Sequence, residues 1–231
     1  MFSAFSRAFS QLGDPALRKV VIIGIAGSLI VFGAIFFVAY AFFEVEGYLD
    51  SWWAGPLLSW AGIPAFLFFS WFFFPATVTL IVSFFLESVA QAVEARHYPE
   101  LPPPRRQTMG DIGWTTTRFM VLAVALNILA LPIFLVFFFL PPINFFVFYA
   151  LNGYLLGREY FELVALRRIE PRRARAVRGT VSGRLFAAGV LIALMMTVPI
   201  LNLVTPVIAT GAMVHLVEAW RRRESEEDDE R

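Results

Sequence analysis

The sequence predicts an all-α integral membrane protein. We expect two long transmembrane helices, two re-entrant (partially penetrating) helical hairpins and an N-terminal interfacial amphipathic helix. The composition is 58% hydrophobic and only 16% charged, with 26 phenylalanines among 231 residues, which excludes a soluble enzyme. Uncharged runs such as Val20–Phe43 exceed the roughly 20 residues that cross a bilayer core. Prolines divide the apolar runs of the second half into shorter arms.

The N-terminal segment predicts a short interfacial helix and then the start of a long one. In residues 1–12 the apolar side chains recur every three or four positions, as on one face of a helix. Gly13 ends this helix, Asp14 is suited to cap the next, and Pro15 fits its first turn. The first 19 residues lack a continuous apolar core, so we expect no cleaved signal peptide. The first transmembrane helix is predicted over 16–43.

The second transmembrane helix is predicted over 61–96, where its last residues form a cytoplasmic extension. Basic residues cluster at Arg96–Arg118, Arg158–Arg184 and Arg221–Arg223. By the positive-inside tendency, these segments and both termini face the cytoplasm. Residues 223–231 form an acidic tail, and residues 1–222 form a single membrane domain.

The last apolar run, 184–222, predicts a re-entrant hairpin. Leu185–Val198 is 14 residues long, about 21 Å of helix, which is too short for a core of about 30 Å. We expect Pro199 to end this arm and Asn202 to lie in the loop. Thr205 then serves as the N-cap of the second arm, and Pro206 occupies its first turn.

The preceding run, 118–168, carries a similar pattern. Pro141-x-x-Asn144 is followed by Gly153, as Pro199-x-x-Asn202 is followed by Gly211, with nine residues from each asparagine to its glycine. This repeat predicts a first hairpin that turns at Pro141 and Asn144. Both of its arms are longer than 14 residues, so two full crossings are an alternative here.

Three stretches together resemble a known family. "MMTVPILNLVTPVIATGAMV", "QAVEARHYPELPPP" and "DPALRK" are similar, in order and spacing, to motifs of the CysZ sulfate permeases. The resemblance implies the two long helices and two partially penetrating hairpins, a homo-oligomer in the bacterial inner membrane, and sulfate uptake that feeds cysteine synthesis. It also implies an anion site at Arg18 and Lys19 with the backbone of Ala16 and Leu17. The family's glycine and second arginine are replaced here by Ala16 and Lys19.

The residues at this helix start allow two interpretations. Free N–H groups at a helix N-terminus plus two cations suit a tetrahedral dianion. Alternatively, Arg18 and Lys19 contact lipid phosphates as ordinary positive-inside charges. The Asp14 carboxylate competes with an anion for the same N–H groups.

The other polar residues of the apolar segments also have alternatives. Asn144 and Asn202 belong to a permeation pathway between the hairpins, or they satisfy backbone groups at their own turns. Four carboxylates near the cytoplasmic ends of apolar segments relay protons, or they pair with Arg96, Arg158, Arg167 or Arg221. These carboxylates are Glu87, Glu159, Glu162 and Glu218.

The sequence predicts no enzyme, no cofactor, no metal site and no nucleic-acid partner. It has no cysteine, and His215 with Glu218 provides too few ligands for a metal. The expected partners are sulfate or a similar oxyanion, membrane lipids and further copies of the chain. The leading hypothesis is an anion permease, and the alternative is a structural or envelope-maintenance membrane protein of the same fold.

Overall fold

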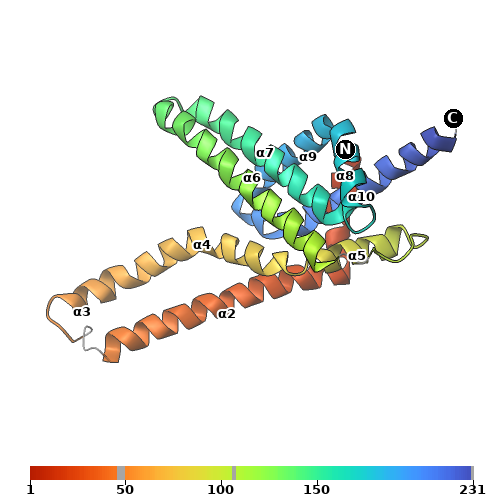
Figure 1. Ribbon diagram of the computed structural model, residues 1–231. Coiled ribbons are helices and arrows are strands. Elements are labelled where there is room, and N and C mark those ends of the chain that lie inside the picture. The colour runs from red at the N-terminus through yellow and green to blue at the C-terminus, as the bar shows by residue number, and fades with distance from the viewer. Residues whose placement is uncertain (46–49, 106–107, 230–231) are drawn as a thin grey trace.

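The computed structural model describes residues 1–45, 50–105 and 108–229, and all regular structure within these ranges is helical. Two long hairpins splay apart from a common base formed by shorter helices and the C-terminal helix (Figure 1). The all-α prediction is therefore confirmed for the described residues.

The first helix, α1 (Phe2–Ser10), packs on the protein by one face. Ala4, Phe5 and Ala8 are buried, and the helix lies against the C-terminal helix. Phe2 and Phe9 stay exposed. The predicted apolar stripe is thus divided between the protein core and the surface. A short 3₁₀ turn, η1 (Gln11–Gly13), follows α1.

The first long hairpin consists of α2 (Pro15–Val45) and α4 (Ile63–Ser83), which lie side by side (Figure 1). A short helix, α3 (Ala54–Leu57), and a π-helical turn, η2 (Leu58–Gly62), precede α4. The chain bends after α4 and continues as α5 (Leu86–His97). The segment predicted as one helix over 61–96 is therefore divided near Phe84, where the helical hydrogen-bond ladder is interrupted.

The second long hairpin consists of α6 (Met109–Val136) and α7 (Pro141–Ala165). Two shorter helices, α8 (Pro171–Thr180) and α9 (Ser182–Thr197), lead into α10 (Pro199–Asp229). Helix α10 contacts α1, α2, α4, α5, α7 and α9, so it is the central element of the core. It also continues through residues 223–229 of the predicted acidic tail, while residues 230–231 lie outside the described ranges.

Within the described residues, four helices are long and apolar enough to cross a membrane: Pro15–Glu44, Ala54–Ser83, Ile112–Val136 and Pro199–Arg223. The pair α8 and α9 meets at an angle of 88°, as in a broken span or a re-entrant loop. These helices make the chain a multi-pass membrane protein.

The turn of the last hairpin differs from the prediction. Val198 is extended (φ −88°, ψ 116°) and separates α9 from α10, because a following proline disfavours the helical region for the residue before it. Asn202, Thr205 and Pro206 lie inside α10. The placement of Asn202 in a loop and of Thr205 as an N-cap is therefore wrong.

Helix α10 continues through Pro206, although the proline nitrogen cannot donate to the Asn202 carbonyl one turn earlier. The hydroxyl of Thr205 donates to the Leu201 carbonyl, and the hydroxyl of Thr210 donates to the Pro206 carbonyl at 2.8 Å. Neither hydroxyl reaches the Asn202 carbonyl, so packing holds the helix together here: residues 205–218 are buried, and α10 contacts six other helices. The second arm consequently begins at Pro199, and it is longer than the predicted arm.

Candidate functional site

The start of α2 has the local structure that its residues predict. Asp14 is extended (φ −65°, ψ 129°), and its Oδ1 accepts a hydrogen bond from the Ala16 N–H at 3.0 Å. Pro15 is the first residue of α2. Asp14 thus caps the helix. Its carboxylate accepts from the Ala16 N–H, which is one of the two backbone groups predicted to bind an anion.

The predicted anion site has two accessible cations. Arg18 and Lys19 are both exposed, whereas the Leu17 side chain is buried in the core. Neither Arg18 nor Lys19 forms an ion pair with any described residue of the chain. Their charges are therefore available to an anion or to a lipid phosphate.

A hollow of about 360 Å³ lies beside this helix start, and its charged lining comes from other residues. Arg7 of α1, Asp14, Arg96 and His97 line it, together with small neighbours. Arg96 forms an ion pair with Asp14. The hydrogen bond from the Ala16 N–H, and next the Arg96 guanidinium, hold the pKa of the Asp14 carboxyl below its usual range.

A polar cluster next to this hollow joins η1, the end of α5 and α10. The Gln11 Nε2 lies 2.8 Å from the Nε2 of His215 and 3.0 Å from the Nε2 of His97. The Tyr98 hydroxyl lies 2.9 Å from the Nδ1 of His215. The described residues include no group of three or more histidine or acidic side chains that would hold a metal ion. This cluster is a hydrogen-bonded junction.

Three of the four candidate carboxylates form ion pairs. Glu87 pairs with Arg167 at 2.8 Å. Glu162 pairs with Arg158 at 2.8 Å. Glu218 bonds the Arg221 guanidinium at 2.9 Å. Glu159 forms no ion pair within the described ranges and lies exposed on α7.

The residues at the two turns play different parts. Pro141 and Pro199 are the first residues of α7 and α10. The Nδ2 of Asn144 donates to the carbonyls of Phe134 and Phe137 at 3.3 and 3.0 Å, so it satisfies the end of α6 at its own turn. Asn202 instead accepts a hydrogen bond from Thr79 of α4 at 3.4 Å. Asn202 therefore connects the last hairpin to the first one.

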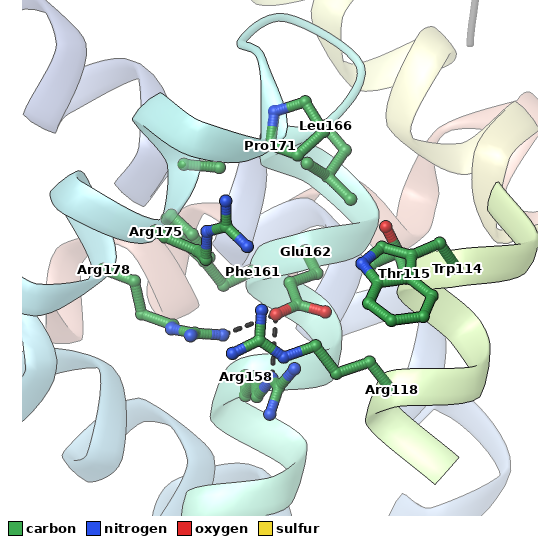
Figure 2. Close-up of a pocket in the computed structure, with 11 residues that line it drawn as sticks. Trp114, Thr115, Arg118, Arg158, Phe161, Glu162, Leu166, Pro171, Arg175 and Arg178 are labelled. Atoms are coloured by element: carbon green, nitrogen blue, oxygen red, sulfur yellow. Dashed lines mark hydrogen bonds and ion pairs between the residues drawn. The ribbon is translucent and has the colours of Figure 1, made fainter. Parts of the chain in front are cut away.

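The sequence-based reasoning named Glu162, Arg158 and Arg167 as candidate ion-pair residues but did not predict the two groups to which they belong. Glu94 of α5 is buried and pairs with Arg167 at 3.2 Å and also with Arg168, both of which follow α7. Four arginines surround Glu162 in a cavity between α6, α7 and α8 (Figure 2). No motif signals either group, because each brings together residues from separate parts of the chain.

Comparison with known proteins gives a family match over most of the chain. The family model described as "Sulfate transporter CysZ/Etoposide-induced protein 2.4" matches residues 4–206. This range includes the start of α2, both long hairpins and the turn at Val198. A search of curated proteins found no individual match of significance.

Proposed function

Because the chain belongs to the family of sulfate transporter CysZ and etoposide-induced protein 2.4, we propose that it is a permease for sulfate or a similar oxyanion. The proposed site of action is the bacterial inner membrane, and the imported sulfate would feed cysteine synthesis. The chain has no enzymatic role in this proposal and needs no cofactor.

The observation that carries this proposal is the pair of unpaired cations at the start of α2. Arg18 and Lys19 lie within the matched residues, are exposed, and form no ion pair in the described part of the chain. Cations beside a helix N-terminus favour an oxyanion by charge and by hydrogen bonding. We assign these two residues the first contact with the anion, where the neighbouring Arg7 and Arg96 add positive charge.

The proposed pathway passes between the hairpins. The 88° bend between α8 and α9 fits a re-entrant segment, and α9 has 16 residues, about 24 Å of helix against a core of about 30 Å. Irregular backbone at membrane depth is tolerated only inside protein or beside water. In this arrangement α2 and α4 are the two full transmembrane helices, and both later hairpins penetrate partially.

Helix α6 supports a different arrangement of the first re-entrant hairpin. It is long and apolar enough to cross the membrane by itself, so full crossing by α6 and α7 is the variant of the proposal. A homo-oligomer would cover part of the apolar surface that the α2–α4 hairpin exposes, where the hairpin projects from the rest of the protein (Figure 1).

The alternative function is structural, in lipid or envelope maintenance. An apolar groove of about 770 Å³ between α2, α4 and α10 favours it, because such a surface fits lipid chains or a partner helix. Growth of a deletion strain that has no other sulfate importer distinguishes the two functions. Normal growth on limiting sulfate would favour the structural role.

Uptake of labelled sulfate into proteoliposomes tests the permease directly. We expect uptake by the wild type, strong loss in the Arg18→Ala/Lys19→Ala variant, and normal uptake in an Arg172→Ala/Arg184→Ala control. Arg172 and Arg184 are likewise exposed, and they belong to the basic cluster Arg158–Arg184. Wild-type uptake no faster than in empty liposomes would refute transport, and a fully active Arg18/Lys19 variant would refute the site.

A further inference from the structure

A second basic site lies between α6, α7 and α8, away from the start of α2. The cavity is lined by Arg118 of α6, Arg158 and Glu162 of α7, and Arg175 and Arg178 of α8. Figure 2 shows Arg118, Arg158 and Arg178 reaching toward Glu162 from three different helices. The three helices thus place four guanidinium groups around one carboxylate.

The charges in this cavity do not balance. A single carboxylate oxygen of Glu162 accepts from both Arg158, at 2.8 Å, and Arg178, at 2.5 Å. Arg118 and Arg175 form no ion pair with any residue in the described ranges. Four positive charges therefore face one negative charge, and the second oxygen of Glu162 cannot neutralise the remainder.

Burial of Arg158 makes this imbalance costly, while Arg118 and Arg175 lie exposed and are accessible to an anion from outside. Arg158 is only 6% exposed, and its guanidinium lies 5.5 Å from the centre of the Phe119 ring. A desolvated cation near three others of the same sign is unfavourable unless an anion compensates it. Planar guanidinium groups present paired N–H donors that match sulfate and phosphate oxygens, which makes arginine the usual residue for such anions.

We propose that this cavity binds one tetrahedral oxyanion, either sulfate or phosphate. The anion is free in solution or belongs to a lipid headgroup, since both carry anionic oxygens on a tetrahedral centre. The cavity leaves about 40 Å³ in which the centre of a water molecule can lie, whereas a single water needs about 10–15 Å³. The cavity therefore accepts a small polyatomic ion.

This site is independent of the proposed transport function. None of its residues belongs to the start of α2, and anion binding here does not require that the protein moves anions. Binding is therefore measured on purified full-length protein carrying Arg18→Ala/Lys19→Ala, which removes the other candidate site. Failure of sulfate uptake and failure of binding are then separate results.

The pocket variant is Arg118→Gln/Arg175→Gln, which removes two charges without breaking an ion pair. The control is Arg172→Gln/Arg184→Gln, which removes the same charge from exposed arginines outside the cavity. Equilibrium dialysis with labelled sulfate and labelled phosphate is carried out in a neutral detergent free of phosphate. A second arm uses a short-chain phosphatidylglycerol as the probe.

We expect saturable binding in the control and binding weaker by about tenfold or more in the pocket variant, because two charge-assisted contacts are lost. Binding of the inorganic ions identifies a free oxyanion as the ligand. Binding of the lipid alone, with the same loss in the pocket variant, identifies a lipid phosphate. Equal binding by the two variants, or no binding of any probe to either, overturns the proposal.

Discussion

Gly189 of α9 packs directly against Gly153 of α7: a Cβ added at Gly189 would lie 1.8 Å from the Gly153 carbonyl oxygen. Gly157, four residues after Gly153, is also in contact, since its own Cβ would lie 2.5 Å from the Leu185 carbonyl oxygen. Small residues at this spacing allow transmembrane helices to approach closely. These glycines set the distance between the two hairpins of the second half.

We therefore expect Gly189→Ala to destabilise the protein by about 3 kcal/mol or more, because backbone atoms must move. Gly183→Ala in the same helix is the control, since a Cβ there meets nothing within 4 Å. Unfolding in mixed micelles of detergent and sodium dodecyl sulfate measures both. Equal stability of the two variants would show that α7 and α9 are not in backbone contact at Gly189.

The buried ion pairs of Glu94 provide the second prediction. Glu94 is 4% exposed and binds two arginines, so Glu94→Ala leaves Arg167 without this partner in the protein interior. We expect a loss of about 3–5 kcal/mol in the free energy of unfolding. The control, Glu100→Ala, removes an exposed pair with Arg222 and costs at most about 1 kcal/mol. A small effect at Glu94 would mean that water solvates its partners.

Docking of α1 on α10 provides the third prediction. Ala8 is 1% exposed, and a Cβ at Gly211 would contact its Cβ at 3.5 Å. Ala8→Leu adds a branched side chain where there is no space, so it should displace α1. Ser6→Leu adds a similar side chain to the exposed face. Hydrogen exchange of the amides in residues 2–10 should accelerate only in Ala8→Leu. Unchanged exchange would contradict this packing.

The sequence predicted features that depend on neighbouring residues and failed where distant contacts decide. Asp14 and Pro15 specify the start of α2 locally, and Pro141 and Pro199 specify the two turns, because capping and proline geometry involve only adjacent residues. Pro206 misled the prediction because distant packing outweighs its local effect: residues 205–218 of α10 are buried against other helices.

The charged groups show the same limit for the candidate sites. Arg18 and Lys19 were identified from a contiguous motif. Glu94 meets its arginines across more than 70 residues of sequence, and the cavity around Glu162 requires three helices. Glu162 was a candidate in the sequence, but Glu94 and the grouping of four arginines around Glu162 were not predicted, since spacing along the chain does not report which helices pack together.

The cap at the start of α2 predicts a pH-dependent stability. The pKa of Asp14 is lowered in the folded protein from its ordinary value of 3.8. A carboxyl with a lowered folded pKa stabilises the protein above its unfolded pKa, and this contribution is lost as the pH falls through the folded pKa. Asp14→Ala should cost about 1 kcal/mol at neutral pH. The charge-dependent part of this cost should decline below pH 3.8 and disappear once the pH is below the folded pKa. A pH-independent difference would show that Asp14 acts only as a neutral cap.

The same carboxylate predicts a gain in anion affinity on its removal. Asp14 places a negative charge, and an acceptor for the Ala16 N–H, beside Arg18 and Lys19, so it repels an oxyanion at the proposed first contact. Asp14→Asn keeps an N-capping side chain but removes the charge, and it also releases Arg96 from its ion pair. In the proteoliposome assay we expect a KM for sulfate lower by about threefold to tenfold, with a stronger dependence on ionic strength than in the wild type.

Glu100→Gln, which removes an exposed carboxylate outside the hollow at the start of α2, should leave the KM unchanged. A KM that rises in Asp14→Asn would mean that the carboxylate orients the cations for the anion, and the repulsion argument would be wrong.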